Sequence, residues 1–97
     1  MKSYKYILSN EAKFDLINIH HFGVYRFGTI QADKYFNAFF NQFAIICKDP
    51  YQFKSVAYIK KGYRKCICGS DSIYYKIKDE TVFIMAIIGS QDIFKKL

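Results

Sequence analysis

Residues 62–77, which read GYRKCICGSDSIYYKI, decide the fold of this 97-residue chain. Alternating apolar and polar side chains lie on both sides of the turn residues Gly69-Ser70-Asp71. Glycine and aspartate favour a tight reversal of the chain, and a period of two favours a strand on each side of it. The segment therefore predicts a β-hairpin with strands over residues 63–68 and 72–78.

Strand-like patterning continues on both sides of this hairpin. Residues 81–88 are apolar on both faces, which predicts a central strand of a sheet. Upstream, residues 55–59 predict a weak strand after a loop over residues 51–54, and Lys60-Lys61-Gly62 predicts the turn that follows it. A short alternating segment over residues 4–8 predicts one further strand at the N-terminal end.

Helical patterning lies between these strands. Ser9 offers an N-cap for a first helix that Gly28 can end, and a broad apolar stripe from Ala32 to Cys47 predicts a second helix that stops at Asp49-Pro50. Only two residues separate the helices, so we expect a helical hairpin lying across a sheet. The prediction is one α+β domain over residues 1–97: an N-terminal strand, a helical hairpin, then a small antiparallel sheet of three to four further strands.

The charge of the chain favours acidic partners. The formal net charge of the chain is +7. Residues 54–97 contribute most of it, with nine basic and four acidic residues. A basic half-chain attracts a nucleic acid, an acidic peptide or the phosphate-rich ribosome. The alternative is a solvated lysine surface with no specific partner.

Cysteine usage and the N-terminal segment indicate the compartment. The three cysteines cannot all pair, and Cys66 and Cys68 share one face of a strand, so a reducing cytosol is expected. Neither a metal site nor another cofactor is predicted. The chain has no leader-like start and no apolar run near the ~20 residues of a membrane span, which predicts a soluble, cytoplasmic protein without membrane contact.

Catalytic constellations are not evident, and no catalytic residue is predicted. Both histidines, His20 and His21, lie on the first predicted helix, and the eight acidic residues are scattered. Binding is better supported, because basic and aromatic residues interleave on the hairpin strands at Tyr63, Arg64, Lys65, Tyr74, Tyr75, Lys76 and Lys78. They could stack on bases and clamp phosphates. Alternatively, the tyrosines belong to the core and the lysines protect strand edges from aggregation.

The motifs GYR at residues 62–64 and GSDSIYYKI at residues 69–77 resemble those of the ParE branch of the RelE/ParE bacterial toxins. YILS at residues 6–9, FG and QA at the helical turn, DP at residues 49–50 and QDI near the C-terminal end follow in the family's order. The resemblance implies the toxin of a type II toxin–antitoxin (plasmid stabilisation) system that inhibits DNA gyrase by direct binding. A cognate antitoxin would neutralise it. The alternatives are a ribosome-dependent mRNA endonuclease of the RelE type, acting on mRNA at the ribosome, and a decayed, non-toxic binding module.

The resemblance also directs attention to particular residues. Arg64 is the familiar charged position of the sheet, and the predicted contacts to target or antitoxin are Tyr63, Arg64, Lys65, Lys76, Lys95 and Lys96. Where many ParE toxins have an arginine and a histidine on the last strand, this chain has Ala86 and Gly89, and Asp71 replaces a turn histidine. These replacements make ribonuclease chemistry less expected.

Overall fold

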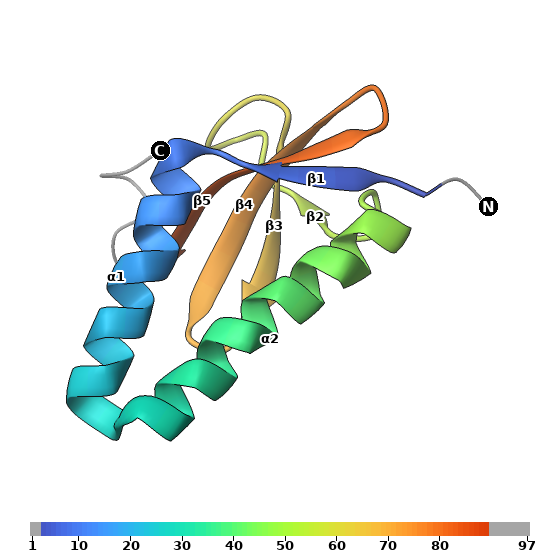
Figure 1. Ribbon diagram of the computed structural model, residues 1–97. Helices are drawn as coiled ribbons and strands as arrows, with labels where there is room; N and C mark the ends of the chain where they lie inside the picture. Colours follow the sequence, from blue (N-terminus) through green and yellow to red (C-terminus); the bar gives the residue numbers. More distant parts are fainter. Residues whose placement is uncertain (1–2, 90–97) are drawn as a thin grey trace.

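The computed structural model describes residues 3–89 as a helical hairpin packed on one face of a five-stranded sheet (Figure 1). The elements are β1 (Lys5–Leu8), α1 (Asn10–Phe27), α2 (Thr29–Lys48), β2 (Lys54–Ser55), β3 (Tyr63–Cys68), β4 (Asp71–Lys78) and β5 (Thr81–Gly89). The strand order is β1-β5-β4-β3-β2. The predicted α+β architecture is confirmed, with four strands after the helical hairpin, and β5 is a central strand.

Short local signals set the limits of the two helices. The Ser9 hydroxyl accepts a hydrogen bond from the Ala12 N–H at 3.0 Å and caps the start of α1. Gly28 ends α1 with a φ of 89°, its N–H donates to the Val24 carbonyl, and α2 begins at the next residue. Because left-handed φ values suit glycine, this one residue allows the sharp reversal of the helical hairpin.

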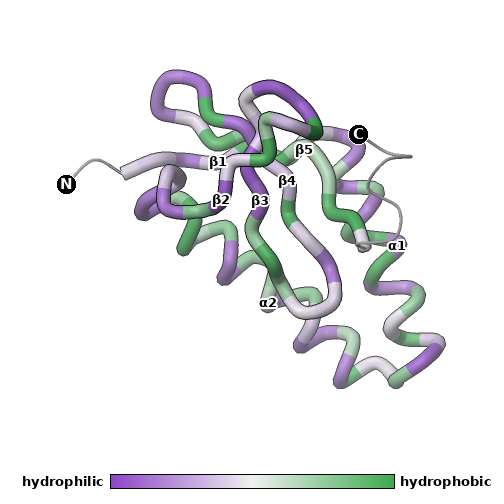
Figure 2. Tube along the Cα trace, turned by 180° about the vertical axis from the view of Figure 1, so that it is seen from behind, coloured by the Kyte–Doolittle hydropathy of each residue, from purple (hydrophilic) through white to green (hydrophobic). Residues whose placement is uncertain are grey.

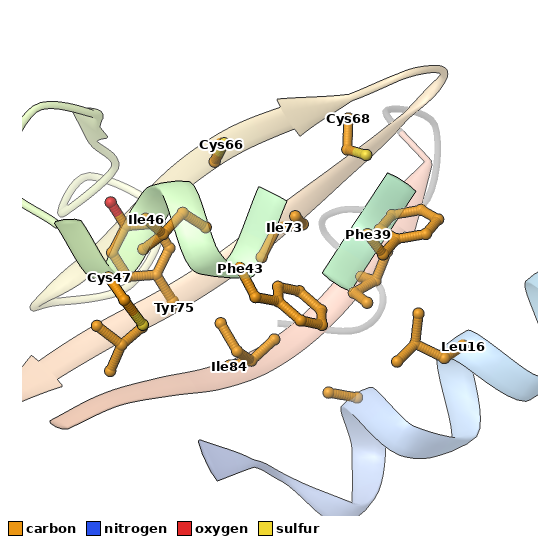
Figure 3. Packing of buried hydrophobic residues seen from close by; sticks show 13 residues of the cluster. Leu16, Phe39, Phe43, Ile46, Cys47, Cys66, Cys68, Ile73, Tyr75 and Ile84 are labelled. Atoms are coloured by element: carbon orange, nitrogen blue, oxygen red, sulfur yellow. The ribbon is translucent and has the colours of Figure 1, made fainter. Parts of the chain in front are cut away.

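Aromatic and aliphatic side chains fill the space between the helices and the sheet. Figure 3 shows Phe39 and Phe43 of α2 in one cluster of buried side chains with Ile73 and Ile84 of the strands. Each of these four side chains is fully buried. Burying a phenylalanine or isoleucine stabilises the fold by roughly 1.5–3 kcal/mol, so this helix–sheet layer is the main stabilising contact.

The predicted strand over residues 55–59 is wrong. Strand β2 covers only Lys54–Ser55, and residues 56–62 form consecutive turns in which the Ile59 N–H donates to the Val56 carbonyl at 2.8 Å. Val56 and Ile59 both pack in a second apolar cluster, with Tyr63 and Tyr74. A turn brings residues three apart to the same side, whereas a strand would separate them, so packing outweighs the strand-like alternation.

The start of α1 is attached to an irregularity in the last strand. Tyr74 pairs with Ala86 and Tyr75 with Ile84, so Met85 is an extra residue that makes a β-bulge in β5. The Ser9 hydroxyl donates to the Met85 carbonyl at 2.9 Å, and a carboxylate oxygen of buried Asp15 accepts the Ile87 N–H at 2.9 Å. These bonds satisfy main-chain groups of β5 beyond the point where β1 ends.

Candidate functional site

Three of the predicted contact residues, Tyr63, Lys65 and Lys76, lie together on the face of the sheet opposite the helices. The register pairs Tyr63 with Lys76 and Lys65 with Tyr74 across the two strands, and directly opposed residues share a face. Tyr63 is only 6% exposed and packs in the second apolar cluster, with the Lys60 ammonium 5.5 Å from its ring centre. The accessible groups at this position are therefore the lysines, and the tyrosine is part of the core.

More lysines surround this pair. Lys54 is opposite Lys65, and Lys5 and Lys78 both pair with Thr81, so all of them project from the face opposite the helices. We call Lys5, Lys54, Lys65, Lys76 and Lys78 the lysine face. All five lie toward one end of the sheet, where β3, β5 and β1 begin and β4 ends. Figure 2 views the molecule from behind and shows β3 as hydrophilic in its first half and hydrophobic in its second.

Arg64 points to the other side of the sheet. Its guanidinium donates to the main-chain carbonyls of Phe53 at 2.6 Å and Tyr51 at 3.3 Å, and it lies 5.2 Å from the centre of the Tyr51 ring. The half-buried arginine thus ties the loop after α2 to β3. The structure separates Arg64 from the lysine face, so the predicted residues do not form one contact surface.

The Arg64→Ala substitution is expected to lower the free energy of unfolding by about 1–2 kcal/mol, because it removes two hydrogen bonds and a ring contact that are partly exposed. Urea unfolding followed by circular dichroism measures this change. The matched control is Lys65→Ala at the next position, where a surface substitution is expected to cost less than about 0.5 kcal/mol. Unchanged stability of the Arg64→Ala variant would show that Arg64 does not anchor the loop.

A groove opens at the other end of the molecule, between the helical hairpin and the β3–β4 turn. Its volume is about 450 Å³. The apolar walls include Phe22 and Phe27, which are 62% and 64% exposed. The full lining is Asn18, Ile19, Phe22, Gly23, Phe27, Gln31, Ala32, Tyr35, Ser70 and Asp71. Exposed aromatic rings around a concave surface are typical of a protein-binding site.

Tyr35 fixes the polar end of this groove. Its hydroxyl lies 2.8 Å from a carboxylate oxygen of Asp71 and 2.9 Å from the Cys68 carbonyl, and it accepts the Ser70 N–H at 3.1 Å. Burial, together with the Asp71 charge, raises the pKa of Tyr35, so the hydroxyl stays protonated and can donate. The arrangement holds the Asp71 carboxylate at the edge of a largely apolar groove.

A known protein family and a solved structure are similar to this chain. The sequence profile of the family described as "ParE toxin of type II toxin-antitoxin system, parDE" matches residues 6–94. The chain belongs to this ParE toxin family. Among solved structures, the chain is similar to one titled "Chromosomal ParDE TA system from P. aeruginosa", with a TM-score of 0.80 and 18% sequence identity over 92% of this chain and 98% of that one. No curated protein matches the chain.

The three thiols and His20, which are suited to nucleophilic or acid–base catalysis, are buried or engaged in this ParE toxin, whereas His21 is exposed on α1. The His20 ring lies between the helices, with Nε2 2.7 Å from a carboxylate oxygen of Asp33 and the ring against Phe36. Cys47, Cys66 and Cys68 are free and buried, and burial raises the pKa of each thiol, which opposes the reactive thiolate. Residues 3–89 contain no cluster of metal-ligating side chains, and none of their helices is long and apolar enough to span a membrane.

The structure places only some of the predicted contact residues on one surface. On the lysine face, Lys76 is exposed and Lys65 is half-buried. Lys95 and Lys96 lie outside the described residues. The groove was missed, because Phe22 and Phe27 sit at helical spacings that fit a core stripe equally well. Tyr74 and Tyr75, which could have been a stacking surface, are both fully buried, and the Tyr75 hydroxyl donates to the Pro50 carbonyl at 2.6 Å.

Proposed function

We propose that this ParE toxin inhibits DNA gyrase by direct binding and that a cognate antitoxin neutralises it. The observation that carries the proposal is the family match over residues 6–94, which covers every described element from α1 to β5 and all of β1 except Lys5. The chemistry of the described residues supports binding over catalysis, since the thiols are buried and His20 is engaged with Asp33.

The groove is the surface that we assign to the antitoxin. An amphipathic helix could place apolar side chains against Phe22 and Phe27, and a lysine or arginine of that helix could reach Asp71. Both rings are exposed in the free chain, so covering them would contribute to affinity. The net charge of +7 further favours an antitoxin segment with acidic residues elsewhere on its surface.

A supercoiling assay with purified gyrase tests the proposed target. Full-length toxin is expected to block supercoiling of relaxed plasmid, and pre-incubation with the protein of the neighbouring gene is expected to restore it. In cells, induction should arrest growth with filamentation and an induced DNA-damage response. Unimpaired gyrase, together with cleaved transcripts in a translating extract, would replace this proposal with the ribosome-dependent endonuclease. No effect in either assay would leave a non-toxic binding module.

A further inference from the structure

The lysine face concentrates positive charge at one end of the sheet. Its five members come from β1, β2, β3 and β4, and the adjoining turn adds Lys60 and Lys61. The described strands contain a single carboxylate, Asp71, which lies by Tyr35 at the far end of β4. Asp79 and Glu80 occupy the β4–β5 turn beside the lysine face. Seven lysines against two acidic residues leave this end of the sheet strongly electropositive.

The pairing of the strands places like charges directly opposite one another. Lys54 is the cross-strand partner of Lys65, which puts their Cβ atoms about 5 Å apart, and Lys76 is the diagonal neighbour of Lys65 at about 7–8 Å. Directly opposed like charges destabilise a sheet. A ligand that carries several negative charges over the same spacing would relieve this repulsion, because each charge could lie between two ammonium groups.

The residue types on this face select the kind of anion. Ammonium groups act as point charges for phosphate, and the bidentate arginine that reads guanine best is missing, since Arg64 points to the opposite side. The two tyrosines of the face, Tyr63 and Tyr74, are buried and offer no ring for a base to stack on. Contacts of this kind hold a phosphate backbone without reading its sequence.

The breadth of the face distinguishes a nucleic acid from an acidic peptide. The lysines extend across the sheet from β2 to β1, away from the groove. Extended peptides usually add to a strand edge, and helical peptides occupy grooves. A regular array of phosphates along a duplex matches a wide array of lysines better.

We propose that the lysine face binds the phosphodiester backbone of a nucleic-acid duplex independently of sequence. This activity goes beyond the proposed function, because it requires neither gyrase nor an antitoxin. For a toxin that acts on a DNA-bound enzyme, the face would hold the molecule on the DNA near its target.

Fluorescence anisotropy with the full-length toxin and a labelled duplex of random sequence tests the proposal. Binding is measured from about 50 to about 200 mM salt, where each phosphate contact contributes about 0.9 to the slope of log affinity against log salt for B-form DNA. The double substitution Lys65→Gln and Lys76→Gln is expected to reduce that slope by about two. Parallel titrations with duplex RNA identify which nucleic acid supplies the backbone.

The matched control is Lys13→Gln with Lys34→Gln, which removes the same charge from exposed positions on α1 and α2. This variant is expected to keep the original slope, and thermal unfolding verifies that both variants fold. Equal slopes for the two variants would overturn the assignment to the lysine face. Failure to bind either duplex at the lowest salt, or binding of polyglutamate in place of both, would overturn the nucleic-acid ligand while leaving the gyrase assay unaffected.

Discussion

Replacing Asp15 by alanine is expected to lower the free energy of unfolding by about 2–3 kcal/mol, the cost of leaving a buried N–H without an acceptor. The carboxylate is 3% exposed and accepts the Ile87 N–H at 2.9 Å, beyond the point where β1 ends. Urea unfolding gives the stability change. Hydrogen exchange at the Ile87 amide gives the cause, because protection there should fall by more than at neighbouring amides of β5.

Two companion variants make the test specific. Asp15→Asn keeps an acceptor oxygen in the same place and is expected to recover about half of the loss, since neutral acceptors bind roughly half as strongly. Lys13→Ala, on the exposed side of the same helix, should change stability by less than about 0.5 kcal/mol. If Asp15→Ala is no worse than Lys13→Ala, the anchoring role assigned to this carboxylate is wrong.

The second large effect is expected at Gly69, where alanine should cost about 3 kcal/mol. Gly69 has a φ of 62°, and an added Cβ would collide with the Tyr35 ring and lie 2.6 Å from its hydroxyl oxygen. The left-handed conformation costs about 1–2 kcal/mol for a residue with a Cβ, and overpacking adds about 1–3 kcal/mol. Displacing Tyr35 would also release Asp71 and should weaken the antitoxin binding that we propose at the groove.

Gly62 provides the control for backbone strain alone. Its φ is 84°, but a Cβ there meets nothing within 4 Å, so Gly62→Ala should cost only about 1–2 kcal/mol. The difference between the two alanine variants measures the clash with Tyr35. Placing Gly69→Ala in a Tyr35→Ala background should remove that difference, and its persistence would show that the strain lies elsewhere.

Local signals predicted much of this fold because the residues that carry them act on their immediate neighbours. Ser9, Gly28 and Pro50 each act within a few residues: α1 begins just after Ser9, Gly28 separates the two helices, and α2 ends two residues before Pro50. The pairing partner of β1, in contrast, is not set by a local signal. Nothing within residues 5–8 specifies a parallel pairing with β5, because that choice depends on packing among elements more than 70 residues apart. The strand prediction for residues 55–59 was wrong for the same reason, because the conformation there is set by the packing of Val56 and Ile59 against Tyr74 of another strand.

The surfaces were harder to predict than the fold. Strand alternation in the predicted hairpin is enough to place Lys65 and Lys76 on one face of the sheet. The observed pairing of Lys65 with Tyr74 and of Lys76 with Tyr63 agrees with that placement. Alternation does not say which face the helices cover, so the side on which Arg64 lies could not be deduced. The groove requires the angle between the helical hairpin and the β3–β4 turn, which no local pattern encodes. Tyr35 and Asp71 meet there although they are 36 residues apart.

The attachment of the first elements to the last strand determines when the chain can fold. Ser9 and Asp15 contact β5 across 76 and 72 residues of sequence, and β1 has β5 as its partner in the sheet. During synthesis β1 leaves the ribosome before β5, so this part of the sheet cannot close until residues 81–89 have been translated. A chain interrupted anywhere before Thr81 lacks the strand that β1 and α1 contact, so nonsense and frameshift mutations upstream of this codon would prevent the sheet from forming.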